Sequence, residues 1–240
     1  MNASQPLNLI YLPYAGASAR QCLRWRSTLT SAISPVPLDR PGRGRLAREQ
    51  PATTLRDAAE QLLPRLLGVG RYALLGQSMG ALLAHELASL TVESGFALPE
   101  FLVVAACRSP LDTSIQLHTH LSSLSDDALL DELATSGHVP AGLRHSPMRS
   151  LFVPGLRSDL ALVAGHAPAT QPQPLPIPLL VWYGVQDTIA SGEDVRRWSA
   201  HTSRSCEITA FPGGHFFLQE NLAEAAAILL RHASRLSGAS

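Results

Sequence analysis

The chain has 240 residues, of which 45% are hydrophobic and 16% charged. This size and balance are typical of one globular domain with a sizeable core. Nineteen basic residues match nineteen acidic ones, so no net charge attracts the whole protein to nucleic acid or to an anionic membrane. Every basic residue is Arg, which excludes chemistry that needs a lysine amine, such as a Walker A loop, a Schiff base or a Ser-Lys dyad.

The cysteines and the chain start indicate a cytoplasmic protein. Cys22, Cys107 and Cys206 are widely spaced and form no C-x-x-C pair, a pattern that fits neither a disulfide framework nor a zinc knuckle. The first six residues lack the pattern of an export signal. No apolar stretch of about 18 residues is present to span a membrane. We therefore expect a soluble, monomeric protein with no membrane or nucleic-acid partner.

Short apolar runs alternate with helical patterns along most of the chain, which predicts a mostly parallel open sheet flanked by helices in one domain, 1–240. The predicted strands are 8–12, 35–38, 72–75, 101–106, 179–183 and 207–211. The predicted helices are 54–67, 81–90, 195–198 and 220–236. Thr54 with Asp57, and Ser191 with Asp194, have the spacing of helix-capping pairs.

The alternation stops at about 110–167, where helical patterns occur without a strand. A connection of this length is uncommon in a regular α/β fold, and we interpret it as an inserted helical lid. Ser125 marks the start of one lid helix and Ser146-Pro147 the start of another. In the second helix Pro154 predicts a kink. An apolar stripe there either packs on the body or lines a substrate site, with packing favoured; it comprises Met148, Leu151, Phe152, Leu156, Leu160 and Val163. The proline-rich segment 168–178 is expected to return to the sheet in an extended form.

Ser78 is the candidate nucleophile. It lies in a Gly-x-Ser-x-Gly segment bounded by Gly76 and Gly80, after a predicted strand and before a predicted helix. That sharp strand-to-helix turn projects a serine beyond the sheet. The motif alone is a modest signal, and its context makes a mere tight turn the weaker interpretation.

A serine hydrolase of this kind takes its acid and its histidine from the ends of later strands. Asp187 follows the strand 179–183 and is the candidate acid, although a turn or capping role remains open for it. Asp194 is better explained as a capping residue, and Asp159 falls in the lid. His215 lies in a glycine-rich loop after the last strand and is the candidate base. The order Ser, Asp, His is that of the α/β-hydrolase fold.

The other histidines fall on helices or in the lid and have no strand-end context. The pair His118 and His120 lacks the further ligands and helical spacing of a zinc site, so we expect no metal. The oxyanion of an acyl-transfer intermediate needs two backbone N–H donors. Met79, directly after the nucleophile, supplies one, and Ala15 in the small-residue loop after the first strand is the candidate for the other, with a plain tight turn as the alternative.

Together these segments resemble the type II thioesterases of polyketide and non-ribosomal peptide synthases, a family that also includes medium-chain fatty acyl carrier-protein hydrolases. The resemblance runs nearly end to end. It is carried by the segments 12–16, 40–43, 76–80, 151–159 and 212–218. Two positions depart from the family pattern: Ala17, where a second glycine is common, and Gly44, where an acidic residue is common.

The resemblance implies the same triad and oxyanion hole, with no cofactor. It implies a substrate acyl or aminoacyl group held as a thioester on the phosphopantetheine arm of an acyl or peptidyl carrier protein. Hydrolysis would clear stalled groups from the synthase. The arginines 40, 43, 45 and 48 form either a docking patch for an acidic carrier or a solvated loop. The rival functions are a carboxylesterase acting on free oxygen esters and a non-catalytic interaction protein.

Overall fold

The computed structural model describes residues 5–111, 116–135, 137, 139, 141–166 and 174–237. Its centre is a six-stranded sheet of order β2-β1-β3-β4-β5-β6 in which every neighbouring pair is parallel. The strands are β1 (Leu7–Leu12), β2 (Ile33–Pro37), β3 (Tyr72–Gln77), β4 (Leu102–Ala105), β5 (Leu179–Gly184) and β6 (Cys206–Phe211). All six predicted strands are therefore confirmed, with ends that differ by at most a few residues.

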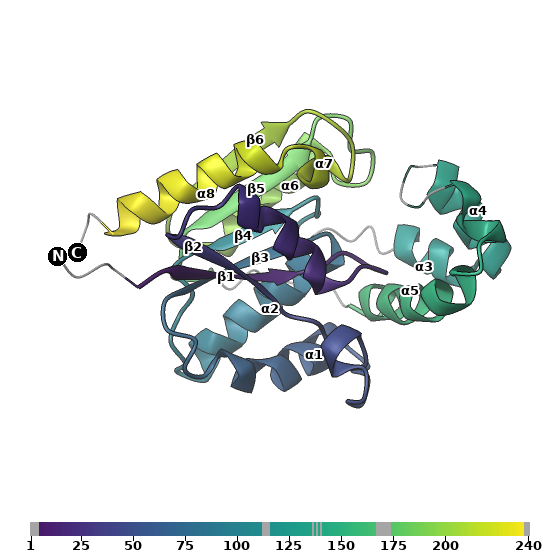
Figure 1. Cartoon of the computed structure of the whole chain (residues 1–240), viewed down its shortest axis with the longest axis horizontal. Helices are drawn as coiled ribbons and strands as arrows, with labels where there is room; N and C mark the ends of the chain where they lie inside the picture. Colours follow the sequence, from purple (N-terminus) through teal and green to yellow (C-terminus); the bar gives the residue numbers. More distant parts are fainter. Residues whose placement is uncertain are drawn as a thin grey trace.

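Helices cover both faces of the sheet (Figure 1). The α-helices of the body are α1 (Leu55–Leu62), α2 (Met79–Glu93), α6 (Gly192–Arg196), α7 (Phe217–Glu220) and α8 (Leu222–Ser237). The 3₁₀ helices of the body are η1 (Ala19–Ser27), η2 (Gly44–Leu46), η3 (Leu63–Leu66) and η5 (Arg197–His201). Helices α1 and α2 lie on one face, and η1 and α8 lie on the other. Helix η1 was not among the predicted helices.

Alternation along the strands divides the core between the two faces. In β5, Leu179 and Val181 belong to the cluster under α1 and α2, whereas Leu180 and Trp182 belong to the cluster under η1 and α8. Successive strand residues point to opposite faces, so a strand buried on both sides has a continuous apolar run. This explains why short unbroken apolar runs located the strands so well.

Capping residues and prolines fix where the helices begin and change form. Thr54 Oγ1 accepts a hydrogen bond from the Asp57 N–H at 3.0 Å, and Ser191 and Asp194 form the reciprocal capping box that was predicted. The predicted helix 54–67 changes from α to 3₁₀ geometry at Leu63, because Pro64 has no N–H to donate back to Glu60. The predicted last helix, 220–236, corresponds to α8, and the short helix α7 before it was not predicted.

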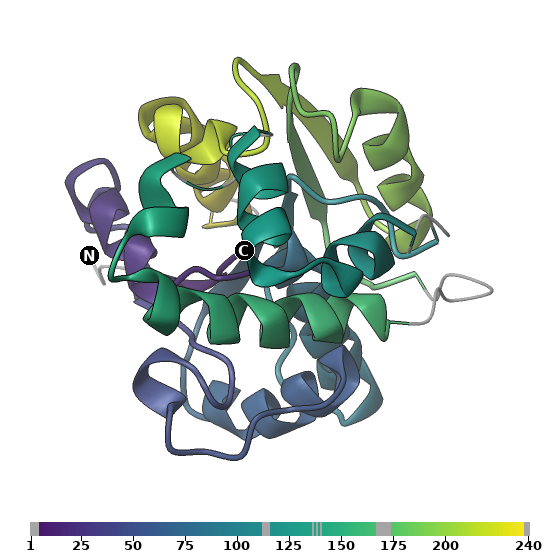
Figure 2. The ribbon, with the colours of Figure 1, turned by 90° about the vertical axis from the view of Figure 1, so that its right-hand side faces the viewer.

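The connection between β4 and β5 is helical in the part that is described. It contains α3 (Gln116–Ser123), α4 (Asp126–Thr135), η4 (Ala141–His145) and α5 (Arg149–Ala164), which we call the helical insertion. Figure 2 shows α5 and its neighbours lying across one end of the sheet, and the strands of Figure 1 point their carboxyl ends toward them. The Ser125 hydroxyl accepts from the Ala128 N–H at 3.3 Å, as expected of a cap. Helix α5 continues through Pro154. Residues 167–173 of the proline-rich return lie outside the described residues.

Of the helices that the structure describes, none has both the length and the apolar character needed to cross a bilayer.

Two buried histidines contact each other on the face of the sheet that α2 covers. His85 of α2 and His201 of η5 have ring centroids 4.9 Å apart, and both pack against Trp198. The Nε2 atom of His85 is buried and has no hydrogen-bond partner among the described residues. Burial, with repulsion from the neighbouring histidines, lowers the pKa of His85 to about 3, and burial lowers the pKa of His201 to about 4. Both rings are therefore neutral in the folded protein at neutral pH.

We expect this pair to make the protein sensitive to mild acid. Below about pH 6.5 the unfolded chain protonates both histidines while the folded protein does not, so the free energy of unfolding falls as the pH drops toward the folded pKa values. At about pH 5 the loss is at most roughly 2 kcal/mol for each histidine. Urea unfolding of the wild type and of His85→Phe, each at neutral pH and at about pH 5, measures it. The variant should lose less stability than the wild type, and equal losses would contradict the assignment.

Candidate active site

Ser78 occupies the tight turn between β3 and α2, with φ of 53° and ψ of −122°. This is an unfavourable region for a residue with a side chain, and it persists because the flanking elements hold it. The turn also demands glycine on both sides. A Cβ atom at Gly76 would collide with the Gly80 carbonyl, and one at Gly80 would collide with the Leu12 carbonyl. The predicted strand-to-helix turn is thus confirmed.

His215 lies in the loop between β6 and α7, within hydrogen-bond reach of the serine. Its Nε2 atom is 3.1 Å from Ser78 Oγ, and its Nδ1 atom is 2.9 Å from Asp187 Oδ2. A His with Nδ1–H donated to the carboxylate leaves Nε2 free to accept the serine proton. The fold therefore brings His215 next to Ser78, 137 positions before it in the chain, and next to Asp187, 28 positions before it.

Asp187 follows β5 and is nearly fully buried. Its Oδ1 atom accepts hydrogen bonds from the N–H groups of Ile189 at 2.8 Å and Ala190 at 3.1 Å, which leaves Oδ2 for His215. Burial by itself raises the pKa of this carboxyl, but the hydrogen bond and charge of His215 and the two backbone donors together hold the pKa below its usual value. The carboxylate is ionised at neutral pH and can stabilise a histidinium.

Ala15 and Met79 both line the same cavity as Ser78. Met79 is the first residue of α2, so its N–H has no acceptor within the helix and points toward the helix N-terminus. Ala15 belongs to the loop after β1. The role of their two N–H groups as oxyanion donors stays a prediction.

The cavity is open to solvent and has about 600 Å³ of empty space when its open part is counted. Its walls are mostly apolar and come largely from the helical insertion. The insertion residues that line it are Leu121, Leu133, Val139, Phe152, Leu156, Leu160 and Val163.

The predicted apolar stripe of α5 therefore divides into two parts. Leu156, Leu160 and Val163 are buried and at the same time line the cavity. Met148 and Leu151 are 58% and 72% exposed, so for these two residues the expectation of packing or lining was wrong. They lie at the start of α5.

Asp159 has a role that sequence analysis missed. This residue of α5 is 1% exposed, and its Oδ2 atom accepts a hydrogen bond from the Gly16 N–H at 2.6 Å. Its Oδ1 atom forms a buried ion pair with Arg40. Arg40 is only 4% exposed, which corrects both interpretations of it, because a buried arginine neither docks a partner nor lies in a solvated loop. The one sequence signal for the role of Asp159 was that a carboxylate stands inside an apolar stripe.

Gln77 and Gln219 form a second polar contact that sequence analysis missed. The Gln219 amide nitrogen donates to Gln77 Oε1 at 2.9 Å, and Tyr11 Oη donates to the same oxygen at 3.2 Å. Gln77 is fully buried beside Ser78, so this contact connects the nucleophile turn to the segment that follows His215. The weak metal candidate His118 falls outside the residues whose side chains are described.

Comparison with known proteins agrees with this geometry. The family model described as a thioesterase domain matches residues 7–235. The gramicidin S biosynthesis protein GrsT of Aneurinibacillus migulanus is 29% identical over 226 residues, covering 92% of this chain and 86% of that protein.

Solved structures give the same assignment. RedJ, a thioesterase of the prodiginine pathway of Streptomyces coelicolor, is 31% identical with a TM-score of 0.82, covering 94% of this chain and 91% of its own. ClbQ, from the colibactin NRPS/PKS pathway, is 26% identical with a TM-score of 0.88, covering 98% of this chain and 100% of its own. The predicted resemblance to type II thioesterases and the predicted fold are confirmed. The chain belongs to the thioesterase family, whose members are hydrolases of thioesters on the α/β-hydrolase fold.

Proposed function

We propose that this thioesterase removes acyl or aminoacyl groups from the phosphopantetheine arm of carrier proteins in a polyketide or non-ribosomal peptide synthase, and so clears stalled groups. The observation that carries the proposal is the hydrogen-bonded series Ser78–His215–Asp187 at the floor of an apolar cavity. The pathway assignment is supported by relatives such as GrsT and RedJ. The three free cysteines are in keeping with a cytoplasmic location.

In the proposed mechanism Ser78 Oγ attacks the thioester carbonyl while His215 Nε2 takes the hydroxyl proton. The N–H groups of Ala15 and Met79 stabilise the oxyanion of the tetrahedral intermediate. When the C–S bond breaks, His215 returns the proton to the departing thiolate and an acyl-enzyme ester remains on Ser78. His215 then deprotonates water, which attacks the ester carbonyl. The C–O bond to Ser78 breaks as His215 returns this proton to Ser78 Oγ, so the free acid leaves and the serine hydroxyl is restored. Asp187 orients His215 and stabilises its cation, and no step uses a metal or cofactor.

The helical insertion serves in this proposal as the lid and as the acyl-binding wall. Its cavity residues are aliphatic or aromatic, so they favour an apolar acyl chain by removing its surface from water. The thioester carbon would lie beside Ser78, and the chain would extend toward Leu156 and Leu160.

The test compares two substrate classes. We expect wild-type enzyme to unload acyl-carrier protein with a kcat/KM far above that for a p-nitrophenyl ester of the same acyl group. Intact-mass spectrometry of the carrier follows the first reaction, and carrier incubated with Ser78→Ala is the control. A preference for the oxygen ester would instead identify a carboxylesterase. Inactivity on both substrates would revive a non-catalytic role, and unloading that persists in the variant would overturn the mechanism.

A further inference from the structure

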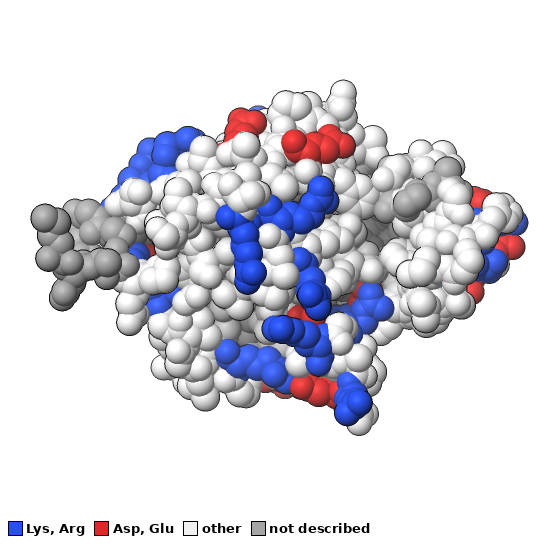
Figure 3. Space-filling view, viewed as in Figure 1, with Lys and Arg blue, Asp and Glu red and all other residues white. Residues whose placement is uncertain are grey.

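The surface beside the cavity carries a concentration of exposed arginines. Figure 3 shows blue side chains in a band over η1 and the segment after β2, with few red ones among them. The exposed members are Arg20, Arg24, Arg26, Arg45 and Arg48, which we call the arginine band. No ion pair joins any of the five to a carboxylate in the described part of the chain. The arginines of α1 and α5, by contrast, are paired with acidic residues.

The two segments of the band are held together from beneath. Asp39 is buried, and its carboxylate accepts hydrogen bonds from the N–H of Ala19 in η1 and the N–H of Arg45 in η2, both at 3.0 Å. A Cβ atom at Gly44 would collide with this carboxylate, which accounts for glycine at this position. The band is therefore presented on a preorganised backbone, which lowers the entropy lost on binding.

The band reaches the cavity rim. Helix η1 follows directly on the loop that contains Ala15, and the Gln21 amide donates to Tyr14 Oη at 3.1 Å. Tyr14 and Ala15 both line the cavity that holds Ser78. A molecule bound on the band is thus positioned to deliver a tethered group into the active site.

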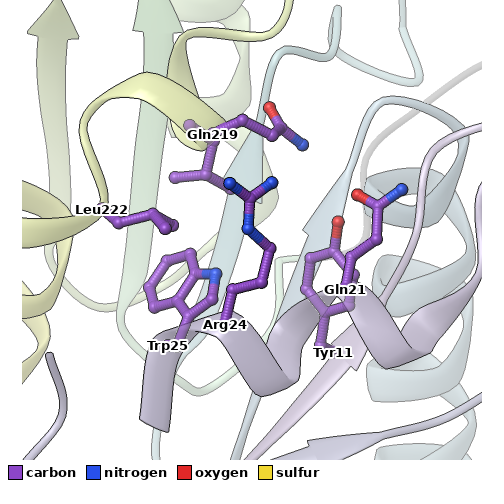
Figure 4. Close-up of a pocket in the computed structure, with 7 residues that line it drawn as sticks. Tyr11, Gln21, Arg24, Trp25, Gln219 and Leu222 are labelled. Carbon is purple, nitrogen blue, oxygen red and sulfur yellow. The ribbon is translucent and has the colours of Figure 1, made fainter. Parts of the chain in front are cut away.

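One arginine of the band lies over a notch between η1 and the segment that begins at α7. Figure 4 shows the Arg24 guanidinium in this notch, with Gln219 and Leu222 on one side and Gln21 on the other. The notch is small and open to solvent. Guanidinium and amide donors at an open notch suit a carboxylate side chain, which Arg binds in a bidentate manner.

We propose that the arginine band is a docking surface for the acidic face of the carrier domain, with a partner carboxylate seated at Arg24. The inference rests on the proposed function. Complementary charge steers such an encounter and fixes its register. The neutral net charge of the whole chain argues for this local partner over nucleic acid or an anionic membrane, which a generally basic protein would favour.

The test is a charge-reversal variant, Arg20→Glu/Arg24→Glu/Arg45→Glu. Its kcat/KM for acyl-carrier protein should fall by about 10- to 100-fold, while its kcat/KM for the same acyl group on N-acetylcysteamine stays at the wild-type value. The matched control is Arg204→Glu/Arg231→Glu/Arg235→Glu, which has the same change in net charge away from the band. Both of its activities should remain those of the wild type.

The other outcomes are also decisive. If the band variant unloads the carrier as well as the control does, docking on the band is wrong and the proposed function still stands. If wild type cleaves the small thioester but never the carrier, the proposed function falls and the docking with it. If the variant loses both activities, the salt dependence of the wild type tests the docking instead. Added salt should lower the wild-type kcat/KM for the carrier and leave that for the small thioester unchanged, and an unchanged value for the carrier would overturn the proposal. The proposal would also be overturned if the wild type bound anionic vesicles or DNA, the variant did not, and both unloaded the carrier equally well.

Discussion

Replacing Ser78 with alanine is expected to lower kcat for thioester hydrolysis by roughly 10⁶-fold. The change removes the oxygen atom that lies 3.1 Å from His215 Nε2 and that would accept the acyl group. The residual rate should come from the oxyanion donors and from binding, which the variant retains. Single-turnover assays with acyl-N-acetylcysteamine measure the loss. A matched thermal melt should show that the variant folds like the wild type.

The triad should also behave as one unit. Asp187→Asn alone is expected to cost about 10⁴-fold in kcat, because the amide no longer holds the His215 tautomer that can accept a proton. Adding Asp187→Asn to Ser78→Ala should cost little more, since residues that act together are strongly non-additive. If the double variant were slower than Ser78→Ala by a further factor of about 10⁴, Asp187 would act independently of the serine. That result would contradict the series Ser78–His215–Asp187.

The strands and the candidate triad were predictable because their signals are local. Each central strand is a short apolar run buried on both faces, and such runs are visible in the sequence. Asp187 and His215 were found from their positions after such strands. The parallel arrangement then brought the carboxyl ends of β3, β5 and β6 to one edge of the sheet.

Features that depend on contacts between distant segments were not predictable. Helix η1 contains five polar residues among nine, and it is located by Ala19, Cys22 and Trp25 packing under the sheet. The local pattern of Arg40 does not indicate burial, and Asp159 is marked only by the apolar stripe around it, because the two residues that pair are 119 positions apart. The exposure of Leu151 was not predictable either. Helical spacing shows which residues share a face, but it does not show how much of that face a neighbouring element covers.

The second large effect is expected at Asp159, which joins α5 of the helical insertion to the loop that contains the proposed oxyanion donor. Asp159→Ala leaves Arg40 buried without a counter-charge, and removing one partner of a buried pair typically costs about 3 to 5 kcal/mol of the free energy of unfolding. It also removes the acceptor of the Gly16 N–H, next to Ala15. We therefore expect kcat to fall by roughly 10²-fold where the variant remains folded. The control Arg65→Ala breaks the half-exposed pair with Glu49 and should cost no more than about 1 kcal/mol.

A double variant separates the two roles of Asp159. Arg40→Met with Asp159→Leu replaces the buried ion pair by apolar side chains, and such replacements are often neutral or stabilising. Urea unfolding should therefore show most of the lost stability restored. The Gly16 N–H would still lack its carboxylate, so kcat should stay about as low as in Asp159→Ala while KM for a small thioester changes less. If kcat recovered together with stability, Asp159 would only hold the fold. If stability alone recovered, its carboxylate would position the loop from which Ala15 contacts the oxyanion.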